Sequence, residues 1–503
     1  MTLIIKIAWR NMFRHRGKSL VIGTILFLGA FLLTLGNSVI TGMEAGLDKS
    51  VVEGFTGDVI LVSKSQQDDN VILGMMGKAV ENISRFDTLR PSLEATGLFR
   101  NLLPVGKNFA MAINEQGGNA GYAFLFGVDF KEWRAMFPNS IQVISGTFPD
   151  STGLLMATGG LEQLYTSMGI WFWPKGAPID TSVLSKDAKE SYPQLNVQND
   201  IVFMGFNEAN TSSDIRLPLQ GVSRFKALNK IWGHFLFVDI NSYRRCMGLF
   251  TDQDKAAPVN AQDQALLNQN NTNLDALFGD PSLLNSAPSG APKKVETVKQ
   301  QPLATSKEAG IYNMVLARFA PGINRTKGLD SLNHFLEKGN LPLRALTWQK
   351  ASGPIGSMTV IIKVALNVFV FFLFFVAIII IINTLSMAAM ERTSEIGMMR
   401  AVGAQKGFIS RMFLVETAFL SSVFGALGVL SGLGTVLFVQ SLKLTTDNDI
   451  LQLFYGGDTF HPIFGFQDFL FTAGQLLLVT LIASVYPVKV AQSITPLDAI
   501  SRD

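Results

Sequence analysis

Long apolar runs with almost no charge are the feature that most limits what this chain can fold into. Residues 364–390 contain no charged side chain, and residues 412–440 contain only Glu416. A helix needs roughly 20 apolar residues to cross a bilayer. Four runs meet this length and predict four transmembrane helices, at 19–41, 357–389, 408–440 and 468–489.

The composition agrees with a membrane protein and argues against several other classes. Charged residues make up 16% of the chain, whereas a soluble domain usually has about 25%. The net charge of +3 is too small to indicate nucleic-acid binding. Cys246 is the only cysteine, so no intrachain disulfide and no cysteine-based zinc site can form. The four histidines are scattered along the chain. We therefore predict no catalytic residue and no metal ligand.

The charges that flank the first run predict how the chain is oriented. Arg14, Arg16 and Lys18 precede this run, whereas Glu44 and Asp48 follow it. By the positive-inside rule, the N-terminus lies in the cytoplasm. Four spans then return the C-terminal tail, 490–503, to the same side. The segment 390–407 is likewise predicted to be cytoplasmic, and 441–467 is predicted to be a short outer loop.

Residues 1–18 have the pattern of an amphipathic helix on the membrane surface. Lys6, Arg10 and Arg14 recur every four residues and share one face, with Trp9 beside them. The alternative is the charged start of a signal peptide. The apolar run that follows is too long for this and lacks an A-x-A cleavage site.

Residues 42–356 are polar enough to form a large domain outside the membrane. Strand-like and helix-like segments at both ends of this region predict an α+β domain, with a large insertion at about 130–310. Within the insertion, residues 251–301 are rich in Asn, Gln, Ala, Pro and Ser, which is typical of a flexible loop. The predicted fold class is therefore an α-helical membrane protein with four transmembrane helices. A large α+β extracytoplasmic domain lies between its first and second spans.

The segment between the second and third runs reads as a short charged helix. Glu391 and Glu395 can share one helical face, and Arg392 can approach Glu395 at three-residue spacing. Gly403 can end the helix. An apolar stripe is formed by Ile396, Met399 and Val402. The residues alone leave two interpretations open, a surface for a partner and an ordinary solvated loop.

Two features inside the third run also have more than one interpretation. Glu416 either pairs or packs near the inner boundary or lines a pathway. Small residues three or four positions apart let helices approach closely in lipid, within the chain or at the interface with a second copy. The alternative for them is local flexibility. These residues are Gly425, Gly428, Gly432 and Gly434.

The chain has no persuasive nucleotide-binding motif of its own. Gly17, Lys18 and Ser19 resemble the end of a phosphate-binding loop, but Met12 stands where its first glycine is required. We therefore do not expect the chain to hydrolyse ATP by itself.

The charged segment resembles a known family signature. The residues 394–404 are similar to the E-I-G-x-x-[RK]-A-x-G-A motif of FtsX-like ABC transporter permeases. The residues 7–12 resemble the N-terminal helix of that family, and Tyr486, Pro487, Ala491 and Pro496 resemble its closing motif. The resemblance covers both ends of the chain and all four runs, and it is thin across 171–301.

This resemblance implies a mechanotransmission (type VII) permease in a bacterial inner membrane. It implies that a separate ABC ATPase dimer docks on the cytoplasmic segment, with ATP and Mg on that ATPase and no cofactor bound by this chain. The implied partners are a second permease copy or paralogue, membrane lipid, a lipoprotein or lipid-linked substrate and a periplasmic acceptor protein, but no nucleic acid. The implied coupling residues are Glu391, Arg392, Glu395, Ile396, Gly397, Met398, Met399, Arg400, Ala401, Gly403 and Ala404.

Within this family, the sequence leaves three functions open. The chain looks most similar to lipoprotein-releasing permeases, so extraction of lipoproteins or other lipid-linked substrates is the leading hypothesis. The alternatives are an efflux permease of the macrolide-exporter type and a transmembrane regulator of cell-wall hydrolases. Outside transport, the chain could be a membrane-anchored binding protein whose inner segment has no function.

Overall fold

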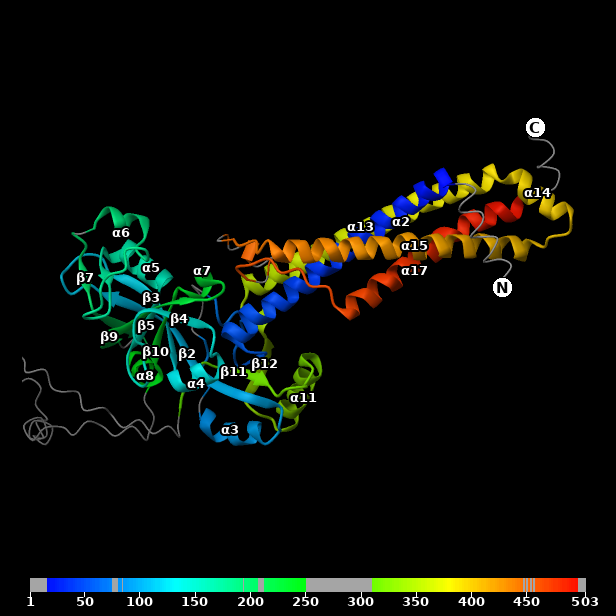
Figure 1. Cartoon of the computed structure of the whole chain (residues 1–503). Helices are drawn as coiled ribbons and strands as arrows, with labels where there is room; N and C mark the ends of the chain where they lie inside the picture. The colour runs from blue at the N-terminus through cyan, green and yellow to red at the C-terminus, as the bar shows by residue number, and fades with distance from the viewer. Residues whose placement is uncertain are drawn as a thin grey trace, which may run out of the picture.

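A computed structural model describes residues 16–74, 80–83, 85–192, 194–206, 212–249, 310–446, 448, 451–452, 455 and 457–495. Most of the predicted surface helix 1–18, the Asn/Gln-rich segment 251–301 and the tail beyond residue 495 lie outside these ranges. The chain forms a long bundle of helices joined at one end to a large α/β domain (Figure 1).

In the described part of the chain, four helices are long and apolar enough to cross a membrane, as the apolar runs predict. Their bounds are α2 (Arg16–Leu47), α13 (Pro354–Glu391), α15 (Lys406–Ser441) and α17 (Phe466–Ser493). Each extends beyond the predicted span. At about 1.5 Å per residue, the 38-residue α13 is about 57 Å long, nearly twice a hydrocarbon core of about 30 Å. This helix is therefore longer than the hydrocarbon core requires.

Polar side chains join the helices inside the bundle. The Asn37 amide of α2 donates to Thr472 Oγ1 at 3.0 Å and to Gln475 Oε1 at 3.1 Å, both on α17. Ser421 of α15 and Thr480 of α17 share a hydrogen bond of 2.7 Å. In lipid no water competes for these groups, so such bonds fix the helices relative to one another.

The α/β domain is built on one mixed sheet with the strand order β12-β1-β11-β2-β3-β10-β5-β9-β4. An additional strand, β8, pairs with both β2 and β9, which closes six of the strands into a ring. The strands of this sheet are β1 (Val59–Ser63), β2 (Phe99–Ile113), β3 (Gly121–Val128), β4 (Ile141–Gly146), β5 (Leu154–Ala157), β8 (Asp200–Phe206), β9 (Ser212–Phe225), β10 (Phe235–Asp239), β11 (Met314–Phe319) and β12 (Leu343–Thr347). A separate short pair consists of β6 (Trp171–Phe172) and β7 (Val197–Gln198).

Shorter helices cover the sheet. Asp129 caps α4, because its carboxylate accepts from the amides of Lys131 and Glu132. Asn324 caps α11 in the same way. The short helices are α3 (Phe86–Glu94), α4 (Phe130–Met136), α5 (Thr158–Met168), α6 (Lys186–Glu190), α7 (Asn229–Trp232), α8 (Ile240–Cys246), α11 (Arg325–Lys338) and α12 (Trp348–Ala351).

The region predicted as an insertion contributes strands to the central sheet. The strand β10 pairs in parallel with β3, where Phe235 lies opposite Phe124. β4, β5, β8 and β9 follow in the same sheet. The described part of this region is therefore continuous with the domain. Alternation along single strands could not show this, because pairing between distant strands leaves no local signal.

Candidate functional site

The charged segment forms a short helix at the end of the bundle that is farthest from the α/β domain (Figure 1). The helix α13 ends at Glu391, α14 runs over Thr393–Ala401, and α15 begins at Lys406. The described start of α2 and the described end of α17 lie at the same end (Figure 1). This segment therefore forms the tip of the bundle that lies opposite the α/β domain.

A buried ion pair holds the start of α14 to α15. Arg392 Nη1 lies 2.8 Å from both carboxylate oxygens of Glu416. The two residues are only 9% and 7% exposed. The sequence pointed Arg392 toward Glu395, and the structure shows its pairing with Glu416. Glu416 thus takes the pairing role that was one of its two interpretations.

The other end of α14 is held by the last turn of α17. Arg400 Nη1 donates to the carbonyl oxygen of Ile494 and, at 3.4 Å, to that of Gln492. The final carbonyls of a helix lack partners within the helix and carry partial negative charge, so a guanidinium is well suited to them. Gln492 also donates to Ser410 of α15. Both neighbouring helices therefore fix the orientation of α14.

An apolar cluster lies beneath α14. Ile396 is 1% exposed, and Gly397 beside it is also buried. The cluster contains residues of α13, α15 and α17 as well, namely Ala389, Ile409, Met412, Phe413, Ala491 and Ile494. This packing makes α14 a rigid part of the bundle end.

The opposite face of α14 is apolar and open. Met398 is 59% exposed and Val402 is 91% exposed, while Glu391 and Ala401 are also exposed. A shallow hollow of about 750 Å³ is lined by Met398, Met399, Val402, Gly403, Ala404, Gln405 and Phe408. Methionine adapts its shape to a partner, so this surface can receive an apolar side chain or a helix from another protein.

Gly403 ends α14 in a conformation that favours glycine. Its φ is +107°, and its amide donates to the carbonyl of Arg400 at 3.0 Å. We expect Gly403→Ala to cost about 1–3 kcal/mol of backbone strain and to shift the hollow. Gly407→Ala is the matched control, because Gly407 lies in α15 with open space around its Cα. Thermal unfolding in detergent should show a lower midpoint for Gly403→Ala only. Equal midpoints for the two variants would contradict this account.

Three of the four glycines between positions 425 and 434 of α15 lie against other helices of the same chain. A methyl group on Gly425 would lie 2.2 Å from Leu476 of α17. On Gly428 it would lie 2.4 Å from the Phe27 carbonyl oxygen of α2, and on Gly432 2.8 Å from Thr34 Cβ. Gly434 has no atom within 4 Å of such a methyl group. The close approach of α15 to α2 and α17 thus depends on the first three.

Gly428→Ala is therefore expected to separate α15 from α2 and to destabilise the bundle by about 1–3 kcal/mol. The obstacle is backbone, which cannot rotate away. Gly434→Ala, in the same helix, should leave stability unchanged or raise it, because alanine is the better helix former. The check is the midpoint of thermal unfolding for both variants in the same detergent. A loss of stability in Gly434→Ala alone would contradict the packing described here.

The first span continues without a break into the α/β domain. The helix α2 passes directly into a π-helical segment, η1 (Asp48–Thr56), which ends at Gly57 with φ of +74°. Phe55, which is fully buried, stacks on Trp232 with ring centroids 4.3 Å apart. Its other ring contacts are Phe126, Trp133, Phe225, Phe235 and Phe237. The end of the span is thus embedded in the core of the domain.

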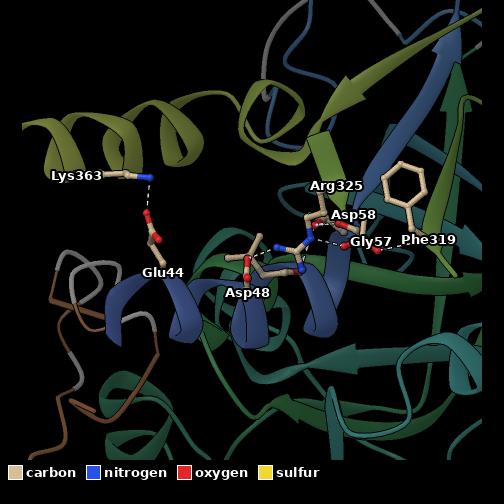
Figure 2. A network of polar contacts seen from close by, with 9 residues as sticks. Glu44, Asp48, Gly57, Asp58, Phe319, Arg325 and Lys363 are labelled. Atoms are coloured by element: carbon tan, nitrogen blue, oxygen red, sulfur yellow. Dashed lines mark hydrogen bonds and ion pairs between the residues drawn. The ribbon is translucent and has the colours of Figure 1, made fainter. Parts of the chain in front are cut away.

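Charged side chains reinforce this joint (Figure 2). Arg325 of α11 donates to Asp48 of η1 and to Asp58 at the start of β1, each at 2.5 Å. Asp58 also accepts from the backbone amide of Phe319 at 2.9 Å. Nearby, Lys363 of α13 pairs with Glu44 of α2. Sequence reasoning missed this joint, because its partners lie 267 and 277 positions apart.

The structure offers no metal centre within its described ranges, where no group of three or more His, Cys, Asp or Glu side chains could hold an ion. The arrangement connects the exposed apolar face of α14 at one end of the bundle to a folded domain at the other.

Comparison with known proteins identifies the C-terminal helical region. Residues 367–496 match the FtsX-like permease C-terminal domain. The ABC transporter permease YtrF of Bacillus subtilis is 40% identical over 78 residues, which cover 16% of this chain and 17% of YtrF. The macrolide export ATP-binding/permease protein MacB of Burkholderia thailandensis is 29% identical over 128 residues, 24% of this chain and 17% of MacB. The lipoprotein-releasing system transmembrane protein LolE of Haemophilus influenzae is 27% identical over 130 residues, 24% of this chain and 30% of LolE.

The chain thus spans less than a third of the length of each of these relatives. The matched region 367–496 contains most of α13 together with all of α14, α15 and α17, so it includes the exposed apolar face of α14 described above. Residues 367–496 therefore form an FtsX-like permease C-terminal domain, and the chain is similar to ABC transporter permeases.

Proposed function

We propose that this chain is a permease subunit that converts ATP hydrolysis on a separate ATPase dimer into movement of its α/β domain. The observation that carries the proposal is the unbroken path between the two ends of the molecule. The helix α14 is fixed to α15 and α17, α15 packs along α2 through Gly428 and Gly432, and α2 ends inside the α/β core. A push on α14 therefore reaches the domain through packed helices.

Charge supports a cytoplasmic position for α14. Five basic residues lie in or beside the α14 end of the bundle, namely Arg392, Arg400, Lys406, Arg411 and Lys489. The positive-inside rule then places this end, with both termini, in the cytoplasm of a bacterium, and the α/β domain outside its inner membrane. ATP and Mg would be bound by the ATPase. A second permease copy or paralogue would complete the transporter.

For the cargo, we propose lipoproteins or other lipid-linked molecules. The α/β domain follows α2 with no flexible linker, because η1 continues the helix into the core. The domain therefore stays near the outer surface of the inner membrane, and a lipid-anchored molecule is confined to the same surface. A second candidate is macrolide-type efflux, favoured by the relatives named MacB. Cross-linking at the domain and identification of the retained molecules, acylated proteins or free small molecules, separates the two.

The exposed apolar face of α14, the proposed docking surface for the ATPase, provides the test of coupling. Met398→Glu and Val402→Glu place a charge on the exposed face of α14, and neither side chain is part of the buried cluster. We expect each to weaken co-purification with the ATPase by about tenfold or more, as for a central interface residue, and to abolish stimulated ATP hydrolysis. Val197→Glu, at an apolar position on the α/β domain that is 40% exposed, is the control. Unchanged binding and hydrolysis in both α14 variants would refute the proposal.

A further inference from the structure

A cavity of about 830 Å³ lies where three parts of the molecule meet. One wall is the outer end of α2 with η1, and it includes Gly42 and Lys49. Another comes from the α/β domain, with Lys226 and Arg318. The third comes from the segment that precedes α17, with Asp458. The volume is that of a typical small-molecule site.

The walls of this cavity are fixed by close contacts. A methyl group on Gly42 would lie 2.3 Å from the carbonyl oxygen of His461, so the segment before α17 rests directly on α2. The amide of Ile463 donates to the Ser38 carbonyl at 3.0 Å, and Gln440 donates to the Pro462 carbonyl at 2.6 Å. The cavity is therefore a built part of the fold.

Arg318 occupies an unusual place in this cavity. Along β11 the side chains alternate, and Met314 and Leu316, both fully buried, face the core that η1 enters. Arg318 continues the same face, where an apolar side chain is expected. Its guanidinium carbon lies 5.6 Å from the centroid of the Phe137 ring. The sequence thus places a permanent positive charge against an apolar wall.

One nitrogen of this guanidinium lacks an acceptor. Arg318 Nη2 is buried and has no hydrogen-bond partner among the described residues. A buried donor on a charged group is costly when it stays unpaired, typically by several kcal/mol. Arg318 lines the cavity, so a molecule that enters it can supply the missing acceptor once the guanidinium turns toward the space, and water is the simplest competitor for this role.

The charges around the cavity favour an anion. Lys49, Lys226 and Arg318 line it, against two acidic side chains, Glu53 and Asp458, which leaves an excess of one positive charge. A guanidinium with free N–H groups is well suited to phosphate oxygens.

We propose that this cavity binds the phosphoryl group of an anionic ligand, with Arg318 as its main donor and Lys226 as a second cation. The phosphoryl group can belong to a phospholipid headgroup or to free phosphate. The site requires neither the ATPase nor a particular cargo, so it stands apart from the proposed function.

The test uses the full-length chain purified in mild detergent from membranes that contain anionic phospholipid. Native mass spectrometry counts the phospholipid retained per chain, and thermal unfolding with added inorganic phosphate examines the free anion. We expect the wild type to retain an anionic phospholipid, and Arg318→Gln to lower its occupancy by about tenfold or more. Lys226 is at an exposed loop position, so Lys226→Gln should fold normally. It should also weaken retention of the phospholipid. Arg224→Gln, exposed on β9 and outside the cavity lining, should retain the lipid.

Two results support the proposal and distinguish the sources of the phosphoryl group. Lipid lost in both cavity variants assigns the site to a headgroup. Phosphate that raises the unfolding midpoint of the wild type but not of Arg318→Gln, without retained lipid, assigns it to a soluble anion. If the wild type shows neither effect, or if both cavity variants behave as the wild type does, Arg318 is satisfied by water and the proposal is wrong.

Discussion

Arg392→Ala is expected to lower the free energy of unfolding by about 3–5 kcal/mol, the cost of removing one partner from a buried ion pair. The reason is that Glu416, only 7% exposed, would be left buried without its partner. The change should also release the start of α14 from α15 and reduce stimulated ATP hydrolysis. Chemical unfolding in detergent micelles and the ATPase rate of the reconstituted complex measure the two effects.

A double variant distinguishes the effect of an unpaired buried charge from the effect of lost side-chain volume. Arg392→Met combined with Glu416→Leu removes both charges and keeps the volume, so stability should largely return. Arg411→Ala, at an exposed position in the same region, should have little effect. If Arg392→Ala is as stable as Arg411→Ala, the pair does not hold this end of the bundle together.

Phe55→Ala is expected to destabilise the α/β domain by about 3–5 kcal/mol, as for other fully buried aromatic residues. Phe55 is fully buried and contacts a ring of aromatic side chains in the core of the domain. Its loss would loosen the joint between the first span and the domain, while the α14 surface at the far end stays intact. We therefore expect the ATPase to bind normally and the domain to lose its response to ATP. Thermal unfolding measures the loss of stability, and co-purification measures ATPase binding.

Two variants control for simple misfolding. Phe55→Leu keeps most of the volume and should cost less, roughly 1–1.5 kcal/mol. Phe109→Ala changes an aromatic residue that is 40% exposed on the same sheet and should have a small effect. Weaker ATPase binding in Phe55→Leu would contradict the expectation that a change at this joint leaves the α14 surface intact.

The sequence predicted the membrane part of the fold well, because its signals are local. Apolar runs with few charges predict spans directly, and the described residues include four helices of sufficient length. The short helix between α13 and α15 was also predicted, and Gly403 ends it with a positive φ. Spacing within one helix could not reveal the partner of Arg392, since Glu416 lies 24 residues away on the next helix.

The joint to the α/β domain was beyond sequence reasoning for a similar reason. Nothing in the composition of 48–56 marks a π-helix, and the ion pairs of Arg325 connect residues far apart in the chain. At Gly434 the spacing predicted a helix contact that the structure does not show within this chain. This glycine shares the spacing of Gly428 and Gly432, but only the structure shows that it faces open space within this chain.

The central claim, that ATP binding at the α14 end moves the α/β domain, can be measured as the distance of this domain from the membrane. A donor dye on Asp330→Cys, at an exposed position of α11, would transfer energy to acceptor-labelled lipids in a nanodisc. Cys246 should not react, because it is buried and burial raises the pKa of its thiol to about 12. With the ATPase bound, we predict a change in transfer efficiency between the nucleotide-free and ATP-trapped states, and none in Phe55→Ala. If the labelled protein with Phe55 unchanged gives the same transfer efficiency in the nucleotide-free and ATP-trapped states, the account is contradicted.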